Sequence, residues 1–135
     1  PTLPLSKRLE ALVQRFEELT DSRCTLKLDL QDRTLSPEQH EHLARIIQES
    51  LTNIMRHAQA SQVEIEVGVG AAGLTIAVRD NGLGFDQEIV KAKGRHGLLS
   101  LEERADILGA TLSIRSGVDA GTTVSLRLPT RKIEE

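Results

Sequence analysis

The 135-residue sequence is poor in aromatic side chains and in cysteine: it has two phenylalanines, no tryptophan or tyrosine, and one cysteine, Cys24. Aromatic residues, at 1% of the chain, are too scarce to form a surface for base stacking, and the formal net charge of −3 offers no basic surface to phosphates. We therefore expect no nucleic-acid partner. A single cysteine excludes an intramolecular disulfide and a cysteine-based zinc site within the chain, which fits a reducing, cytoplasmic setting.

Long hydrophobic runs are missing as well. Without an apolar run of about 18 residues or a charged-then-apolar leader, the sequence predicts no membrane span, no signal peptide and no direct membrane contact. Its 39% hydrophobic and 27% charged residues are typical of an ordinary folded protein, and we expect one domain over residues 1–135. Because the chain begins with Pro1 and not methionine, we expect a piece of a longer protein, whose anchoring in the inner membrane stays open.

Hydrophobic periodicity divides the chain into helices and strands. Helical spacing predicts one helix over residues 4–20 and a long one from the capping signature at 36–39 to about Ala58. A capping-box pattern at Ser100 predicts a further helix that stops at Gly109. Alternating segments predict strands over residues 24–30, 63–69, 74–78, 112–114 and 124–128. Because two connections are hairpins, we expect an α/β (α+β) two-layer sandwich, with a mixed, mostly antiparallel sheet and helices on one face.

Three polar residues on the long helix, Glu49, Asn53 and His57, follow one another at i, i+4 and i+8 and so form one ridge. The ridge runs along the edge of the helix's apolar stripe and not opposite to it. Its side chains should therefore face a cleft that borders the core. A partly solvated helix flank is the alternative. The apolar stripe consists of Leu43, Ile47, Leu51, Ile54 and Ala58.

Asp80 follows the strand 74–78 in the phase of its inward-facing residues, so its carboxylate should point toward the core side. A buried carboxylate needs a hydrogen-bond donor, and the exocyclic amine of a purine is one candidate. The alternative is that Asp80 caps a turn through Asn81-Gly82. Thr122, in phase with the inward-facing strand residues after it, should place its hydroxyl beside the same pocket or within the core.

The segment between Asp80 and Gly97 has no periodicity and is rich in glycine. Long loops in compact domains are usually functional, and glycine lets backbone amides approach a ligand closely. Gly97-Leu98 leads into the next predicted helix, whose free amides form a ready anion site. A merely flexible loop is the alternative. The glycines concerned are Gly82, Gly84, Gly94 and Gly97.

Four segments, in this order and spacing, resemble the motifs of the histidine-kinase ATP-binding family. Residues 49–58 resemble its N box, 80–85 its G1 box and 94–98 its G2 box, while 121–124 resemble its last glycine motif. The resemblance covers roughly residues 36–129 and implies the Bergerat fold shared with gyrase, Hsp90 and MutL. The run from Gly97 to Ala105 resembles the subgroup of nitrate/nitrite sensor kinases.

The resemblance implies a role for each matching residue. Asn53 would coordinate the Mg²⁺ that bridges the ATP phosphates, Glu49 would polarise a group near the γ-phosphate, and Asp80 would accept from the adenine amine. Residues 82–97 would form the ATP lid, expected to be mobile without nucleotide; Leu99 stands where a second small residue is common. The other residues of the ATP site would be Arg56, His57, Gly82, Gly84, Gly97, Leu98, Thr122 and Thr123.

The expected activity is thus that of the catalytic domain of a two-component sensor histidine kinase. Its substrate histidine would lie on a dimerisation domain absent from this chain, since His40 lacks the context of a phosphoacceptor and should face solvent. The expected downstream partner is a response regulator of the NarL class. The alternatives are a serine kinase of the anti-sigma-factor type and the ATPase module of a gyrase-, chaperone- or MutL-like protein. The compact lid and residues 102–105 favour the sensor kinase.

Overall fold

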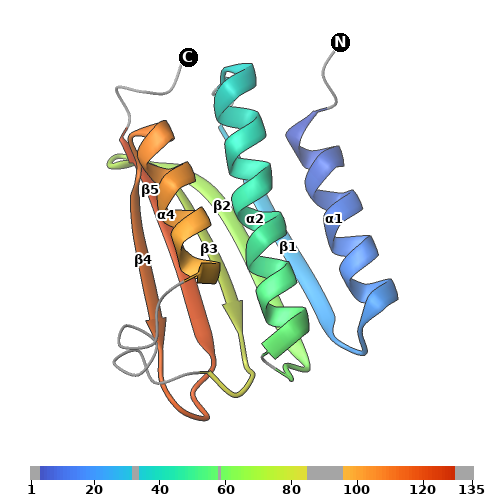
Figure 1. Ribbon diagram of the computed structural model, residues 1–135. Coiled ribbons are helices and arrows are strands. Elements are labelled where there is room, and N and C mark those ends of the chain that lie inside the picture. The colour runs from blue at the N-terminus through green and yellow to red at the C-terminus, as the bar shows by residue number, and fades with distance from the viewer. Residues whose placement is uncertain (1–3, 32–33, 58, 85–95, 130–135) are drawn as a thin grey trace.

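The computed structural model describes residues 4–31, 34–57, 59–84 and 96–129, and for residues 96–99 it describes the backbone alone. Among these residues, three helices lie side by side on one face of a five-stranded sheet (Figure 1). The elements in chain order are α1 (Leu5–Leu19), β1 (Arg23–Asp29), α2 (Pro37–His57), β2 (Gln62–Gly70), β3 (Gly73–Asp80), α4 (His96–Leu108), β4 (Thr111–Ser116) and β5 (Thr122–Pro129).

The sheet has the strand order β1-β2-β3-β5-β4. β1 and β2 are parallel and are joined through α2, whereas the other neighbouring pairs are antiparallel. In Figure 1, α4 runs in the opposite direction to α1 and α2. The structure therefore confirms the predicted two-layer sandwich with a mixed, mostly antiparallel sheet and helices on one face.

Strict alternation in the strands explains how the core forms. Val63, Ile65 and Val67 of β2 are buried while the residues between them are exposed or half-buried, and β3 and β5 continue the same phase. This apolar face packs against helices that bury their own stripes, among them Leu43, Ile47 and other residues of α2. In the parts of the chain that the structure describes, no helix is both long and apolar enough to cross a membrane.

The start of α2 has the predicted capping box. The Ser36 hydroxyl accepts a hydrogen bond from the Gln39 amide at 3.1 Å, and the Gln39 side chain accepts one from the Ser36 amide at 2.9 Å. Each side chain satisfies a backbone donor that a helix start leaves unpaired. The capping box therefore fixes the beginning of the helix that carries the N-box residues.

Two expectations were wrong. α4 begins at His96, four residues before the predicted cap at Ser100, whose hydroxyl donates to Glu49 instead. His40 does not face solvent: it is only 8% exposed, and its Nε2 is a buried atom without a hydrogen-bond partner among the described residues. Burial, and then the charge of Arg8 on α1, lower the pKa of His40. The error at His40 arises from the packing of α1 on α2, which periodicity within one helix does not show.

Candidate functional site

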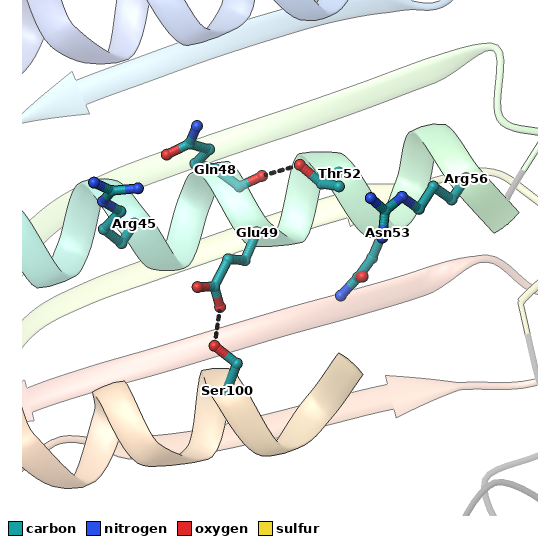
Figure 2. A pocket seen from close by; sticks show the side chains of 7 residues that line it. All are labelled: Arg45, Gln48, Glu49, Thr52, Asn53, Arg56 and Ser100. Carbon is teal, nitrogen blue, oxygen red and sulfur yellow. Dashed lines mark hydrogen bonds between the residues drawn. The ribbon is translucent and has the colours of Figure 1, made fainter. Parts of the chain in front are cut away.

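A groove of about 320 Å³ follows the flank of α2 that turns toward α4. Figure 2 shows Glu49 and Asn53 extending from α2 toward the α4 side, with Glu49 meeting Ser100. Two of the three residues of the predicted ridge, Glu49 and Asn53, therefore line a cleft. The residues that line the groove are Arg45, Gln48, Glu49, Thr52, Asn53, Arg56 and Ser100.

Glu49 is held by two side chains from α4. Its Oε2 accepts a hydrogen bond from Ser100 Oγ at 2.8 Å, and its Oε1 accepts one from Arg104 Nε at 3.0 Å. The side chains of Glu49 and Arg104 are each 28% exposed, so this ion pair is partly withdrawn from water. The sequence placed Glu49 in a cleft, but its two partners are more than 50 residues away and were not foreseen.

Asn53 lies one turn after Glu49 and is half-buried in the groove. Arg56 also lines the groove and is exposed, which leaves its guanidinium available to an anion. His57, the last residue of α2, is exposed and does not line this groove. Of the predicted N-box residues, the structure thus brings Glu49, Asn53 and Arg56 together and leaves His57 outside.

Asp80 stands at the end of β3, paired with Val63 on one side and Thr122 on the other. Its Oδ1 accepts a hydrogen bond from the Gly82 amide at 2.8 Å, so the turn-capping role is present. Burial raises the pKa of Asp80, and hydrogen bonds from the backbone amides of Gly82 and Thr122 oppose the rise. The half-buried carboxylate is therefore anchored at the end of the central strand and remains a hydrogen-bond acceptor there.

Paired residues in a sheet share a face, so Thr122 lies on the helix side together with Asp80. Its hydroxyl is 2.8 Å from that of Ser116, within hydrogen-bond distance across β4 and β5. Thr123 has the opposite phase, is paired with Arg79, and lies on the face without helices. Only the backbone of Thr123 can therefore contribute to a site on the helix side.

Asn81 is a positioning residue that sequence analysis missed. Its Oδ1 accepts hydrogen bonds from the amides of Ser61 and Gln62 at 2.9 and 3.0 Å, and its Nδ2 donates to Ser61 Oγ at 2.9 Å. These bonds tie the end of β3 to the start of β2 and so fix the chain direction after Asp80. The only signal in the sequence was the Asn-Gly pair, which indicated a turn but not this anchor.

Gly84 and Gly121 serve close backbone packing. Both have positive φ, +65° and +73°, and a Cβ atom on Gly84 would collide with the carbonyl of Gly117. The Asp119 amide also donates to the Leu83 carbonyl at 2.6 Å. The segment after β3 therefore packs closely against the turn between β4 and β5. This packing explains why position 84 is a glycine, an explanation that the sequence did not reveal.

The second glycine motif is described in part. His96, Gly97 and Leu98 form the first turn of α4, so their backbone lies at a helix N-terminus, close to where the sequence placed it. The first amides of a helix lack intrahelical acceptors and carry partial positive charge. Gly94 and the rest of the predicted lid from residue 85 to 95 lie outside the described residues.

These features define a class: a domain with a mixed sheet, helices on one face, and a polar groove between the N-box helix and a helix that follows a glycine-rich segment. Residues 38–132 match the family described as histidine kinase-, DNA gyrase B-, and HSP90-like ATPase. The match covers most of the chain, which therefore belongs to this family.

Curated relatives that match the chain include sensor histidine kinases. The chain is 35% identical over 121 residues to sensor histidine kinase LiaS of Bacillus subtilis (strain 168), covering 89% of this chain and 33% of LiaS. It is 32% identical over 132 residues to the nitrate/nitrite sensor protein NarQ of Escherichia coli (strain K12), covering 97% of this chain and 23% of NarQ. The chain thus spans about a third or less of these relatives.

The fold is that of solved histidine-kinase domains. The histidine kinase domain of a blue-light-activated kinase from Erythrobacter litoralis EL346 superposes with a TM-score of 0.80 at 22% identity, covering 96% of this chain and 63% of that one. The ATP-binding domain of PrrB from Mycobacterium tuberculosis gives 0.71 at 22% identity, with 95% of both chains covered.

Proposed function

We propose that this chain is the catalytic, ATP-binding domain of a two-component sensor histidine kinase. It binds Mg-ATP and transfers the γ-phosphate to a histidine on a dimerisation domain outside these 135 residues. The observation that carries the proposal is the groove in which Glu49 and Asn53 stand one turn apart, facing α4. The sensor kinases LiaS and NarQ among the relatives support a kinase over a gyrase- or MutL-like ATPase.

The residues of the groove fit a magnesium nucleotide. The Asn53 amide oxygen is a hard ligand of the kind Mg²⁺ prefers. Among the described residues, no group of three or more His, Cys, Asp or Glu side chains is placed to hold a metal. With Asn53 as a protein ligand, Mg²⁺ would take its other ligands from phosphate oxygens and water, as is usual for this ion.

The nucleotide would extend from the end of β3 toward α4. Asp80, a half-buried acceptor on the helix side of the sheet, would accept a hydrogen bond from the adenine amine, and the Thr122 hydroxyl shares that face. At the phosphate end, the first amides of α4 and the exposed Arg56 provide positive charge. His57 and the backbone of Gly82, Gly84, Gly97, Leu98 and Thr123 complete the proposed site.

When bound, Mg-ATP would supply an electrophilic γ-phosphorus, and the metal would partly neutralise the negative charge of the phosphate oxygens. The protein's contribution is positioning and electrostatics. Arg56 and the first turn of α4 hold the phosphates, Asp80 orients the base, and Glu49 accepts a hydrogen bond from the attacking group near the γ-phosphate. A carboxylate in that place polarises the nucleophile without itself becoming phosphorylated.

The partner proposals follow the relatives. A response regulator would take the phosphoryl group from the histidine, and a regulator of the NarL class is favoured because NarQ is a relative and residues 97–105 resemble the nitrate/nitrite sensor subgroup. We further propose that this domain is cytoplasmic and that residues 1–135 act as one unit. Anchoring of the parent in the inner membrane would be a property of the parent's other segments.

Calorimetric titration of the chain with ATP and ADP, with and without Mg²⁺, tests the proposal. We expect binding that Mg²⁺ strengthens and that Asn53→Ala makes insensitive to Mg²⁺. The chain should also transfer phosphate from radiolabelled ATP to a separately supplied dimerisation domain of its parent, and should not label itself. Absence of binding at millimolar nucleotide, or acid-labile label on the chain alone, would contradict the proposal.

A further inference from the structure

The contact between α2 and α4 goes beyond simple helix packing, because two residues of α4 engage both oxygens of one carboxylate. Ser100 and Arg104 are four residues apart and so lie on the same side of α4. Ser100 donates to Oε2 of Glu49 and Arg104 donates to Oε1, at 2.8 and 3.0 Å. With a donor on each oxygen, the carboxylate cannot rotate about its terminal bond without losing a hydrogen bond.

Arg104 is itself fixed by a second contact to α2. Its Nη1 is 3.3 Å from Nδ1 of His42, which lies two turns before Glu49. A guanidinium donates only, so Nδ1 accepts and the ring proton is on Nε2, the atom that lies 4.0 Å from a Glu38 oxygen. Arg104 therefore spans two turns of α2 with a planar group, a geometry that a lysine ammonium does not reproduce.

The location of these donors matters because Ser100 lies near the start of α4 and also lines the groove with Glu49 and Asn53. Any shift of α4 that follows nucleotide binding at its first turn would be passed directly to the Glu49 carboxylate. Charge-assisted hydrogen bonds are stronger than neutral ones, and this pair is partly withdrawn from water, so we expect the carboxylate to follow such a shift and keep its donors.

We propose that Arg104, together with Ser100, is a positioning residue that sets the orientation of the Glu49 carboxylate for phosphoryl transfer. This inference rests on the proposed function, in which Glu49 polarises the attacking group. Arg104 does not touch the nucleotide in this scheme. Its removal should therefore slow the chemical step while leaving nucleotide affinity nearly unchanged.

The test measures phosphotransfer from Mg-ATP to the separately supplied dimerisation domain, together with ADP binding by calorimetry. Arg104→Met keeps the aliphatic packing and removes both donors. We expect kcat to fall about tenfold or more, with the KM for ATP and the Kd for ADP changed less than about threefold. Arg104→Lys, which keeps the charge but not the planar group with several donors, should recover kcat only in part.

A double-mutant cycle separates positioning from an independent role. If Arg104 acts through Glu49, the Glu49→Gln, Arg104→Met double variant should be no slower than Glu49→Gln alone. Arg8→Met is the matched control, because Arg8 is also 28% exposed and also pairs with a glutamate, Glu41 at 2.6 Å, but lies on α1. The Arg8→Met variant should lose about as much stability as Arg104→Met and should keep the wild-type kcat.

The outcomes are distinguishable. Wild-type kcat in Arg104→Met, or losses that add to those of Glu49→Gln, would overturn this inference and leave the proposed function standing. Wild-type kcat in Glu49→Gln would overturn the role of Glu49 and the inference with it. If Arg104→Met shows no cooperative thermal unfolding, Ser100→Ala and Arg104→Lys decide instead: wild-type kcat in both would overturn the inference.

Discussion

The backbone carbonyl of Asp80 occupies the space that a side chain on Gly121 would need. Gly121 has φ +73°, and its neighbour Thr122 is paired with Asp80 across β3 and β5. The turn between β4 and β5 is therefore in close backbone contact with Asp80, the residue proposed to recognise adenine. Because this contact is between backbones, no repacking of side chains can relieve a substitution there.

Replacing Gly121 should accordingly be costly. Gly121→Ala combines an unfavourable φ with a collision against a backbone carbonyl, and should lower the free energy of unfolding by about 1–3 kcal/mol. It should also weaken ATP binding, since Asp80 must move. Gly68→Ala is the control: a Cβ there meets nothing within 4 Å, and its stability should change little. Urea unfolding measures the stability of both variants. Equal stabilities of Gly121→Ala and Gly68→Ala would contradict the packing explanation.

Asn81→Ala tests the anchor between β2 and β3. The substitution removes three side-chain hydrogen bonds, so the amides of Ser61 and Gln62 would have to hydrogen-bond to water instead. Because Asn81 is exposed, water can replace part of the loss, and we expect about 1–2 kcal/mol of destabilisation. Thermal unfolding measures it. Ser61→Ala, which removes only one of the three bonds, should be milder; the reverse order would contradict the assigned anchor.

Local patterns in the sequence were sufficient for most of the fold. The alternation of Val63, Ile65 and Val67 predicted β2 because burial of one sheet face requires a period of two. The Ser36–Gln39 capping box was predictable because its bonds join residues three apart. The family motifs pointed to Glu49, Asn53 and Asp80; Glu49 and Asn53 line one groove, whereas Asp80 lies on the helix side of the sheet and does not line that groove.

What the sequence could not show depends on contacts between distant segments. Ser100 matched a helix cap as a local pattern, but its hydroxyl instead meets Glu49 from the neighbouring helix. His40 sits at a helix start that would be solvated in an isolated helix and is covered when α1 packs on α2. Gly84 was expected to let the backbone approach a ligand, but the sequence did not show its close packing against Gly117, which depends on the path of another hairpin.

The buried His40 predicts a pH dependence of stability. Burial lowers its pKa below 6.5 in the folded protein, so the unfolded chain binds a proton more readily than the folded one. The stability from a neutral His40 is thus present above about pH 6.5 and is lost as the pH falls toward the folded-state pKa. His40→Leu removes the titrating group, and its stability should fall less between about pH 7.5 and pH 5 than that of the wild type.

The control for this pH dependence is His57→Leu, since His57 is exposed at the end of α2. Urea midpoints across the pH range should be shifted by the His40 substitution and hardly by the His57 one. The charged groups that face His40 are Arg8 from α1 and Glu41 from α2. Parallel pH curves for the wild type and His40→Leu would contradict burial of His40 in its neutral form.

Asp80 and Asn53 should contribute to opposite ends of the nucleotide, and adenosine distinguishes them. Asp80→Ala removes the proposed adenine acceptor and should weaken adenosine and ATP by a similar factor, about tenfold for one charged hydrogen bond. Asn53→Ala removes the proposed metal ligand and should weaken Mg-ATP while leaving adenosine unchanged, because adenosine carries no phosphate. GTP should bind worse than ATP to the wild type, since guanine presents an acceptor where Asp80 requires a donor. Isothermal titration with the three ligands decides: if Asp80→Ala weakened ATP alone, Asp80 would belong to the phosphate end and the proposed orientation of the nucleotide would be wrong.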